Sequence, residues 1–293
     1  MTKDADLLVS VIIPTFNRWP MVGEAVDSVL AQAAAGHELI VVDDGSTDET
    51  RRRLRDCGAR LTVLTQSRRG VAAARNAGVR HASGNYLAFL DSDDLWRPGK
   101  LERQLDFMES NPRAKICQTD EIWIRNGVRV NPRHKHRKPS GDIFRASLEL
   151  CLVSPSAVMM RRELFERVGG FDESLPVCED YDLWLRISKD TEIPLIPEAL
   201  VTRRGGHADQ LSRSTWGFDR FRVTSIANLI EAGLDAEKAG WALEAMAKKV
   251  TILAQGFRKR GNETMALEYE ERLRRARSCV ARVKDVTNPF RPA

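Results

Sequence analysis

Residues 86–94 read Tyr-Leu-Ala-Phe-Leu-Asp-Ser-Asp-Asp, so an acidic cluster directly follows an apolar run. The first five residues predict a buried strand. Neighbouring carboxylates repel one another unless a positive charge lies beside them, and hard divalent cations prefer carboxylate oxygens. The stretch therefore predicts a metal site that holds a phosphate. The alternative is a strand followed by a helix cap and a solvated loop.

Three further apolar runs precede this one, and helical stretches separate them. The expected strands are 9–13, 39–42, 61–64 and 86–90, and the expected helices are 22–32, 48–57 and 71–82. Continuous apolar strands that alternate with helices predict an α/β fold, whose mostly parallel central sheet has helices on both faces. Ligands of such sheets bind beyond the C-terminal ends of the strands. Because Thr15, Asp44 and Asp93 each follow a strand, we expect them to converge on one crevice.

Five motifs in the chain resemble those of the family 2 glycosyltransferases. They are, in order, VSVIIPTFNR at 9–18, VVDDGSTD at 41–48, RNAG at 75–78, LDSDD at 90–94 and CEDYDLW at 178–184. The likeness covers about residues 7 to 210. It implies the Rossmann-like GT-A fold and an inverting transfer of one sugar from a nucleotide sugar to a hydroxyl group. It says little about which sugar and which acceptor are used.

The resemblance also implies which residues bind the nucleotide sugar. Thr15 and Asp44 are expected at the base and ribose, and the wider set is Pro14, Thr15, Asn17, Asp44, Arg75, Asp91, Ser92 and Asp93. Asp44 has an alternative role as a turn residue that binds its own backbone. Arg75 has an alternative role as a structural salt bridge to an aspartate of the acidic motif.

A divalent cation, Mn²⁺ or Mg²⁺, is the cofactor that the resemblance implies. Asp93 is its expected direct ligand, and Asp91 is expected at the ribose, at a metal-bound water or at the metal itself. His207 is a candidate third ligand, because a late histidine often closes over the donor in this fold. Arg203 or Arg204 is then expected at a phosphate, while a surface or hydrogen-bonding role is the alternative for His207.

The expected catalytic base is Asp180. An inverting transferase needs a carboxylate that takes the proton of the acceptor hydroxyl, and the Glu179–Asp180 pair matches the motif that supplies it. Helical spacing places Leu183, Trp184 and Ile187 on the same face as Asp180. Asp182 points elsewhere, and its distance of four residues from Arg186 predicts a surface ion pair. Stabilisation of the helix N-terminus is the alternative role for Asp180.

The acceptor side offers fewer signals. Trp123, Glu179 and Trp184 are candidates for acceptor contacts, although isolated tryptophans more often belong to the core. Residues 133–138 read Arg-His-Lys-His-Arg-Lys, which favours a solvated loop over a site for an acidic ligand. Processive relatives carry a Gln-x-x-Arg-Trp motif. Here Ser214 follows Gln210-Leu-Ser-Arg213, which favours the addition of a single sugar.

The predicted domain organisation is a GT-A domain over 1–207 and a helical region over 208–293. Within the GT-A domain, about 7–112 form the nucleotide half and 113–207 the acceptor half. The helical region holds 16 Lys and Arg against 11 Asp and Glu, while the first 207 residues hold 30 of each, so the whole excess of +5 lies in this region. A packed appendage is the default prediction. Docking to an anionic membrane surface and a homodimer contact are the alternatives.

Composition narrows the class of protein. The five cysteines are odd in number and show no C-x-x-C spacing, so we expect reduced thiols and a cytoplasmic location. The sequence shows no signal peptide and no apolar stretch of about 20 residues. Despite the pI near 9.0, no basic stripe with interleaved aromatic residues indicates nucleic acid.

The expected substrates are a nucleotide sugar, with UDP favoured, and a glycan or lipid-linked acceptor. A sugar nucleotidyltransferase would need a glycine-rich loop with lysine after the first strand, and residues 14–19 read Pro-Thr-Phe-Asn-Arg-Trp instead. A catalytically silent sugar-binding module is the rival of a different class. Asp93 and Asp180 weigh against that rival.

Overall fold

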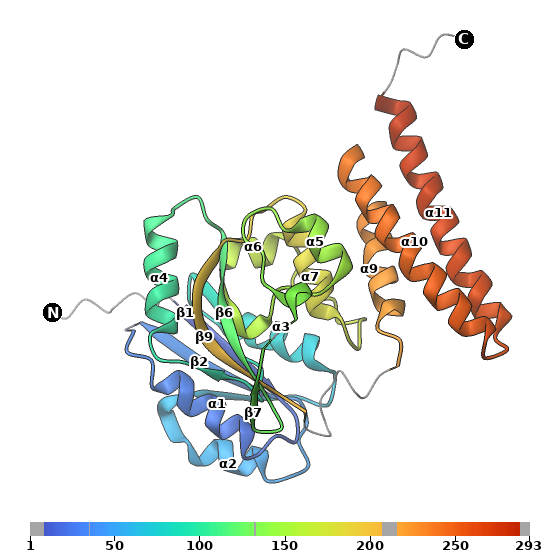
Figure 1. Cartoon of the computed structure of the whole chain (residues 1–293). Coiled ribbons are helices and arrows are strands. Elements are labelled where there is room, and N and C mark those ends of the chain that lie inside the picture. The colour runs from blue at the N-terminus through green and yellow to red at the C-terminus, as the bar shows by residue number, and fades with distance from the viewer. Residues whose placement is uncertain (1–8, 35, 132, 207–215, 288–293) are drawn as a thin grey trace, which may run out of the picture.

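A mixed sheet of nine strands forms the centre of the computed structural model, which describes residues 9–34, 36–131, 133–206 and 216–287 (Figure 1). The strands run in the order β3-β2-β1-β4-β8-β6-β9-β5, and β7 pairs with β6. They are β1 (Val9–Thr15), β2 (His37–Asp43), β3 (Thr62–Thr65), β4 (Tyr86–Phe89), β5 (Leu95–Trp96), β6 (Ile116–Arg125), β7 (Val128–Val130), β8 (Val158–Arg161) and β9 (Leu195–Gly205). The strands β1 to β4 are parallel, as expected, and β8 is antiparallel to both its neighbours, β4 and β6.

Helices cover both faces of this sheet because β1 alternates its side chains between two cores. Val9, Val11 and Ile13 pack with helices α1 (Met21–Leu30), α2 (Thr50–Asp56) and α4 (Lys100–Ser110). Ile12 faces the opposite core, with α3 (Val71–His81), α6 (Arg162–Arg167) and α7 (Glu179–Ser188). Every residue of β1 is buried, which explains why its sequence reads as a continuous apolar run.

The sequence patterns did not predict the short strand β5, the helices α4 and α5 (Phe144–Glu149) or the long strand β9. The Asn126-Gly127 turn joins β6 to β7, and both residues adopt positive φ, at 50° and 77°. The pairing of β9 with β6 contains register shifts near Asp120, so buried and exposed residues do not alternate along β9. The strand therefore lacks the two-residue periodicity that would predict it.

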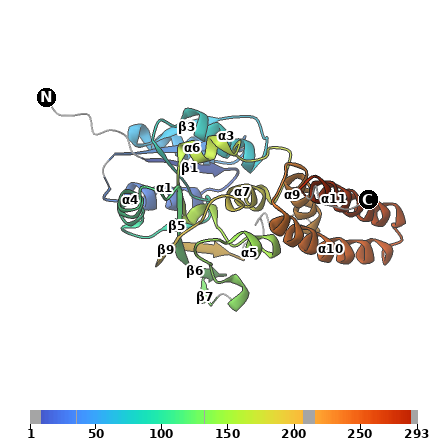
Figure 2. The same ribbon diagram turned by 90° about the horizontal axis from the view of Figure 1, so that it is seen from above.

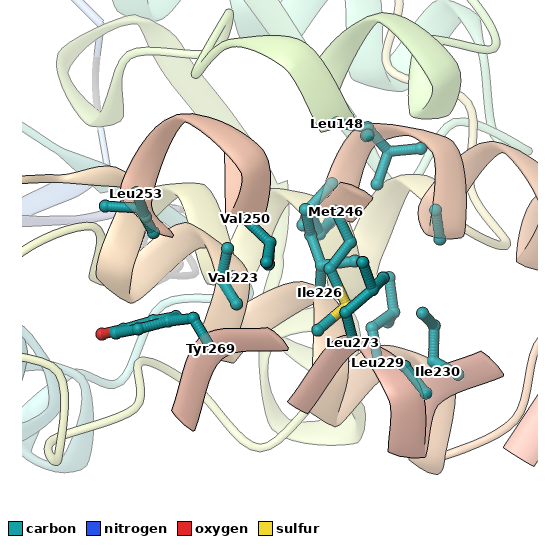
Figure 3. Packing of buried hydrophobic residues seen from close by; sticks show 14 of the residues in the cluster. Leu148, Val223, Ile226, Leu229, Ile230, Met246, Val250, Leu253, Tyr269 and Leu273 are labelled. Carbon is teal, nitrogen blue, oxygen red and sulfur yellow. The ribbon is translucent and has the colours of Figure 1, made fainter. Parts of the chain in front are cut away.

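The described C-terminal helices are α9 (Asp219–Glu231), α10 (Ala236–Arg258) and α11 (Glu263–Thr287). Helix α9 packs beside α7 and α10 beside α5, as the view from above also shows (Figure 2), and α10 and α11 pack together as a hairpin with Gly261 between them. Side chains from α5, α9, α10 and α11, among them Leu148, Ile226, Met246 and Leu273, share one apolar cluster (Figure 3). The predicted boundary at 207 and 208 lies outside the described residues.

The same apolar cluster includes residues of α7. Tyr181 and Leu185, each 1% exposed, pack into it from the helix that carries the Glu-Asp motif. Hydroxyl Oη of Tyr181 donates a hydrogen bond to the Leu148 carbonyl at 2.8 Å. The C-terminal helices therefore support the back of α7. Within the described part of the chain, none of these helices is long and apolar enough to cross a membrane.

Candidate active site

The loops after β1 and β2 are joined to each other. Thr15 and Asp43 are partners in the parallel register, and the Asp44 amide donates to the Thr15 carbonyl at 2.8 Å. Asn17, at φ 49°, donates its backbone N–H to Ser46 Oγ at 2.9 Å, and its Oδ1 accepts from the Thr47 amide at 2.8 Å. Positive φ is uncommon outside glycine and marks a constrained loop. Asn17 thus joins the loop after β1 to the loop after β2.

Both aspartates after β2 bind the protein itself. Asp43 accepts from the Ser46 amide and from Arg51 Nε, each at 2.9 Å. Asp44 accepts from Gln66 Nε2 at 2.7 Å and from the amides of Arg69 and Gly70 at 2.8 Å. Asp43 therefore makes a local turn contact, whereas Asp44 joins the loop after β2 to residues 66–70. A nucleotide contact by Asp44 stays a prediction.

Cations accompany the acidic motif after β4. Asp93 Oδ2 lies 3.1 Å from Arg18 Nη1, and Asp91 Oδ1 lies 2.6 Å from Arg75 Nη2. Ser92 is buried between them. Asp94 is buried too, and accepts from Ser156 Oγ at 2.7 Å. Burial, together with the charges of Asp93 and Asp91, raises the pKa of Asp94 well above its ordinary value.

Arg75 connects two motifs that are distant in sequence. Its guanidinium donates from Nη2 to Asp91 and from Nη1 to Glu179, at 2.6 Å in each case. The side chain is 3% exposed and lies over the ring of Phe171. Burial and the nearby Asp180 raise the pKa of Glu179 to about 7, although Arg75 opposes this rise. The salt-bridge role of Arg75 is therefore confirmed, and its pairing brings the acidic motif next to α7.

The start of α7 presents Asp180 at a partly exposed position. Cys178, which precedes the helix, adopts φ 65° and so turns the chain sharply into its first turn. Oδ1 of Asp180 accepts from the Tyr181 amide at 2.7 Å, and Oδ2 accepts from the Cys151 thiol at 3.4 Å. Asp180 is thus half-buried, oriented by two donors and open to solvent. These are properties that a proton acceptor for a bound hydroxyl needs.

On the same helix Trp184 is a core residue and not an acceptor contact, and the predicted ion pair of Asp182 forms but its carboxylate is buried. Trp184 is 1% exposed and belongs to the core between the sheet and α7, so its ring has no open face for a sugar. Asp182 is 4% exposed and does not form a surface pair. It accepts from Arg186 Nε at 2.8 Å, while the same guanidinium donates to the carbonyls of Val168 and Gly170. This pair fastens α7 to the loop after α6.

Trp123 and Arg203 are neighbours on the paired strands β6 and β9. Trp123 is half-buried, donates to Glu121 Oε1 at 2.7 Å and lies 5.5 Å from the Arg203 guanidinium. Arg204 is engaged elsewhere, because it donates to the Asp93 carbonyl at 2.5 Å and pairs with Glu24. Arg203 pairs with Glu121 Oε1 at 3.5 Å but is 45% exposed, so it is the better candidate for a phosphate contact. His207 lies outside the described residues.

The basic run 133–138 is only partly solvated. Arg133, His134, Lys135 and Arg137 are exposed, as the loop prediction requires. Lys138 differs, because its ammonium lies 2.9 Å from Glu121 Oε2 and its side chain is 4% exposed. The last residue of the run therefore anchors it to β6.

The acidic motif suits a metal that arrives with a phosphate. Within residues 9–34, 36–131, 133–206 and 216–287, no group of three or more His, Cys, Asp or Glu side chains could hold a metal ion. Mg²⁺ usually binds one or two carboxylates together with the phosphates of a substrate. Asp91 Oδ2 has no hydrogen-bond donor among the described residues, so it offers such an oxygen. Asp91 and Asp93 therefore fit a metal site that substrate phosphates complete better than a site built from protein ligands alone.

Comparison with known proteins decides the family. The model described as glycosyl transferase family 2 matches residues 10–169, more than half of the 293-residue chain. The chain belongs to this family. All five cysteines of this family 2 protein are free thiols, which agrees with the expectation from their spacing.

Relatives of this family 2 chain include named transferases. The Escherichia coli UDP-Glc:alpha-D-GlcNAc-diphosphoundecaprenol beta-1,3-glucosyltransferase WfgD is 36% identical over 219 residues, which cover 74% of this chain and 82% of WfgD. The uncharacterised glycosyltransferase RP339 of Rickettsia prowazekii is 32% identical over 202 residues, or 67% of this chain. The chain spans 64% of RP339 and 37% of a similar Rickettsia felis protein, so some relatives are considerably longer.

Solved structures confirm the GT-A fold. Staphylococcus aureus TarS 1-349 in complex with UDP-GlcNAc superposes with a TM-score of 0.73 at 19% identity, covering 96% of this chain and 89% of that one. The mannosyltransferase PcManGT from Pyrobaculum calidifontis, in complex with GDP-Man and Mn²⁺, gives a TM-score of 0.54 at 19% identity. That match covers 98% of this chain and 89% of PcManGT.

Sequence reasoning missed two contributors to this site. Arg18 pairs with Asp93, and Cys151 contacts Asp180. The signal for Arg18 was present, because it ends the first motif and follows β1 at the same edge of the sheet. Cys151 lies in an irregular segment after α5, where no periodicity indicates which way a side chain points.

Proposed function

We propose that this chain is an inverting glycosyltransferase that moves one sugar from a nucleotide sugar to a hydroxyl of a glycan or lipid-linked acceptor. The observation that carries the proposal is the pairing of Arg75 with both Asp91 and Glu179. Through Arg75, the acidic motif and the Glu-Asp motif lie next to each other. Transfer needs both motifs, because the leaving diphosphate and the base must lie on opposite sides of the anomeric carbon of the donor.

Asp180 acts as the general base. As the acceptor oxygen forms a bond to the anomeric carbon, the bond from that carbon to the diphosphate oxygen breaks, and Asp180 takes the hydroxyl proton. The bonding electrons leave with the nucleoside diphosphate. Because attack comes from the face opposite the leaving group, the configuration at the anomeric carbon inverts. The Cys151 and Tyr181 donors hold Asp180 ready for this step.

Residues at the strand ends bind the donor. Oγ1 of Thr15 is buried and has no hydrogen-bond partner in the described chain, so a bound nucleotide would satisfy it. Asp44 and Asn17 set the shape of the base pocket through their loop contacts. Arg203 contributes positive charge toward the diphosphate.

Asp93, with Asp91 beside it, would hold the divalent cation. When bound, Mn²⁺ or Mg²⁺ supplies positive charge that stabilises the departing diphosphate. Arg18 and Arg75 already lie against these carboxylates, so the motif remains balanced when no substrate is present. PcManGT, whose structure holds GDP-Man with Mn²⁺, supports this assignment by analogy of fold.

A UDP-sugar is the favoured donor. WfgD is named for UDP-Glc and an acceptor on diphosphoundecaprenol, and TarS was solved with UDP-GlcNAc. A polyprenyl acceptor would place the enzyme at the cytoplasmic face of a membrane. The excess positive charge of 208–293 supports peripheral contact there, because anionic headgroups attract basic segments. A homodimer contact through these helices stays an alternative prediction.

Calorimetric titration tests the donor assignment. UDP, GDP and dTDP are each titrated with and without Mn²⁺, and the same series is repeated with Asp93→Asn. We expect UDP to bind the wild-type chain more tightly when Mn²⁺ is present, and Asp93→Asn to remove this gain. A folded protein that binds none of the three nucleotides would contradict the proposal and favour a glycan-binding module.

A further inference from the structure

Cys151 lies directly against the candidate base. Its Sγ atom is 3.4 Å from Oδ2 of Asp180 and also 3.4 Å from the Val153 carbonyl. A thiol has one proton to donate, and hydrogen bonds to ionised acceptors are the stronger kind. An ionised Asp180 therefore attracts this proton more strongly than the Val153 carbonyl does.

The two oxygens of Asp180 are held from different parts of the fold. The Tyr181 amide, on α7 itself, donates to Oδ1 at 2.7 Å, while Cys151 reaches Oδ2 from the segment after α5. Burial and the charge of Asp180 raise the pKa of the Cys151 thiol well above its ordinary value. The thiol therefore stays protonated and remains a donor over the neutral pH range.

We propose that Cys151 is a positioning residue whose thiol fixes the orientation of the Asp180 carboxylate and favours its ionised form. This inference rests on the proposed role of Asp180 as the base. Rotation about the terminal torsion of an aspartate is soft, so one donor on each oxygen restricts a movement that the backbone alone permits. The acceptor hydroxyl then donates its proton to an Asp180 carboxylate whose orientation is fixed.

Other charged and titratable groups surround this pair. They are Cys178 just before α7, Glu179 and Tyr181 on α7, Arg222 on α9 and Arg203 on β9. A substitution at 151 leaves all of them in place. A change in the pH dependence of transfer between variants at this position therefore reports the Cys151 contact.

The test compares Cys151→Ala, Cys151→Val and Cys151→Ser with wild type by the pH profile of kcat/KM and by separate kcat and KM values. Loss of a donor to a carboxylate disfavours its ionised form, so alanine and valine should move the acidic limb to higher pH by about half a unit or more. We also expect kcat to fall about tenfold, with the donor KM unchanged. Serine keeps a donor, so its limb should stay in place or move to lower pH.

The controls separate this inference from the proposed function. Cys279→Ala removes a partly buried thiol of α11 that does not contact Asp180, and its pH profile should match wild type. Valine fills the space if alanine fails to fold. Two results refute the positioning role alone, provided that Asp180→Asn is inactive. One is an acidic limb that does not move in Cys151→Ala and Cys151→Val. The other is an acidic limb at higher pH in Cys151→Ser. An Asp180→Asn enzyme with normal transfer refutes the proposed base, and the positioning role fails with it.

Discussion

Nη1 of Arg75 lies 2.6 Å from Oε1 of Glu179, although 104 residues separate them in the sequence. Their side chains are 3% and 6% exposed, so the pair is almost completely shielded from solvent. The same guanidinium also holds Asp91. Because the removal of one partner leaves a buried charge without compensation, both partners matter to the fold as well as to the site.

Replacing Arg75 with methionine should therefore destabilise the protein. We expect the free energy of unfolding to fall by about 3–5 kcal/mol, measured by denaturant unfolding, because Glu179 is left buried without its cation. Arg80→Met on the same helix is the control. Arg80 is exposed and lies 3.8 Å from Glu173, so its loss should cost about 1 kcal/mol or less. Equal losses for the two variants would contradict the structural role of Arg75.

Lys100 should make stability depend on pH. Its ammonium is fully buried, contacts Gln104 Oε1 at 2.5 Å and lies over the Trp96 ring. Burial lowers the pKa of Lys100 to about 7 from its ordinary value of 10.5. Between these two values the unfolded chain binds more protons than the folded one, so the free energy of unfolding rises with pH. Below about pH 7 both states hold the proton, and this dependence ends.

Lys100→Met removes that titration and fills much of the same space. Denaturant unfolding of both proteins at several pH values between 7 and 10 provides the measurement. The wild type should gain stability relative to the variant as pH rises. Parallel curves for the two proteins would show that the ammonium is solvated in the folded state.

The two tryptophans near the motifs should respond differently to truncation. Trp184 is a core residue, so Trp184→Ala should lower the free energy of unfolding by about 3–5 kcal/mol. Trp123 is half-buried, so Trp123→Ala should cost less stability and raise the acceptor KM. Thermal unfolding and steady-state kinetics of both variants check this. A Trp123→Ala enzyme with the wild-type acceptor KM would remove that residue from the acceptor site.

Within the basic run, Lys138 should behave unlike its neighbours. Lys138→Ala leaves Glu121 buried beside a more distant Arg203, and we expect a loss of about 3 kcal/mol in unfolding free energy. Combined Arg133→Ala, Lys135→Ala and Arg137→Ala substitutions affect exposed side chains and should leave stability within about 0.5 kcal/mol. A rise in acceptor KM in this triple variant would indicate that the loop contacts acceptor phosphate. A destabilised triple variant would contradict the exposed loop.

Much of the nucleotide half could be predicted because its signals are local. Apolar runs gave the positions of β1, β2, β3 and β4 to within a few residues, and polar residues at their ends indicated the crevice. Of the residues expected to converge, Thr15 and Asp44 do meet, because the Asp44 amide donates to the Thr15 carbonyl. Such juxtapositions follow from parallel pairing alone, since all C-terminal ends reach the same edge.

The rest depends on contacts that no local pattern encodes. The spacing that placed Trp184 and Asp180 on one face was correct, but spacing does not say where along the helix the core ends and the crevice begins. Asp182 pairs with Arg186, four residues away as expected. Arg186 also donates to the Val168 carbonyl in the loop after α6, and the Asp182 side chain is buried. Arg75 had several acidic candidates. Only the tertiary fold, which brings α3 and α7 to the same core on one face of the sheet, selects Glu179.

Asp180→Asn tests the central claim most directly, because asparagine keeps the size of the side chain and removes the carboxylate. The measurement is single-turnover sugar transfer alongside calorimetric donor binding. We predict that donor binding remains within about twofold of wild type while transfer falls by 10²-fold to 10⁴-fold or more. Transfer at the wild-type rate by a variant that binds donor normally would contradict the assignment of Asp180 as the base.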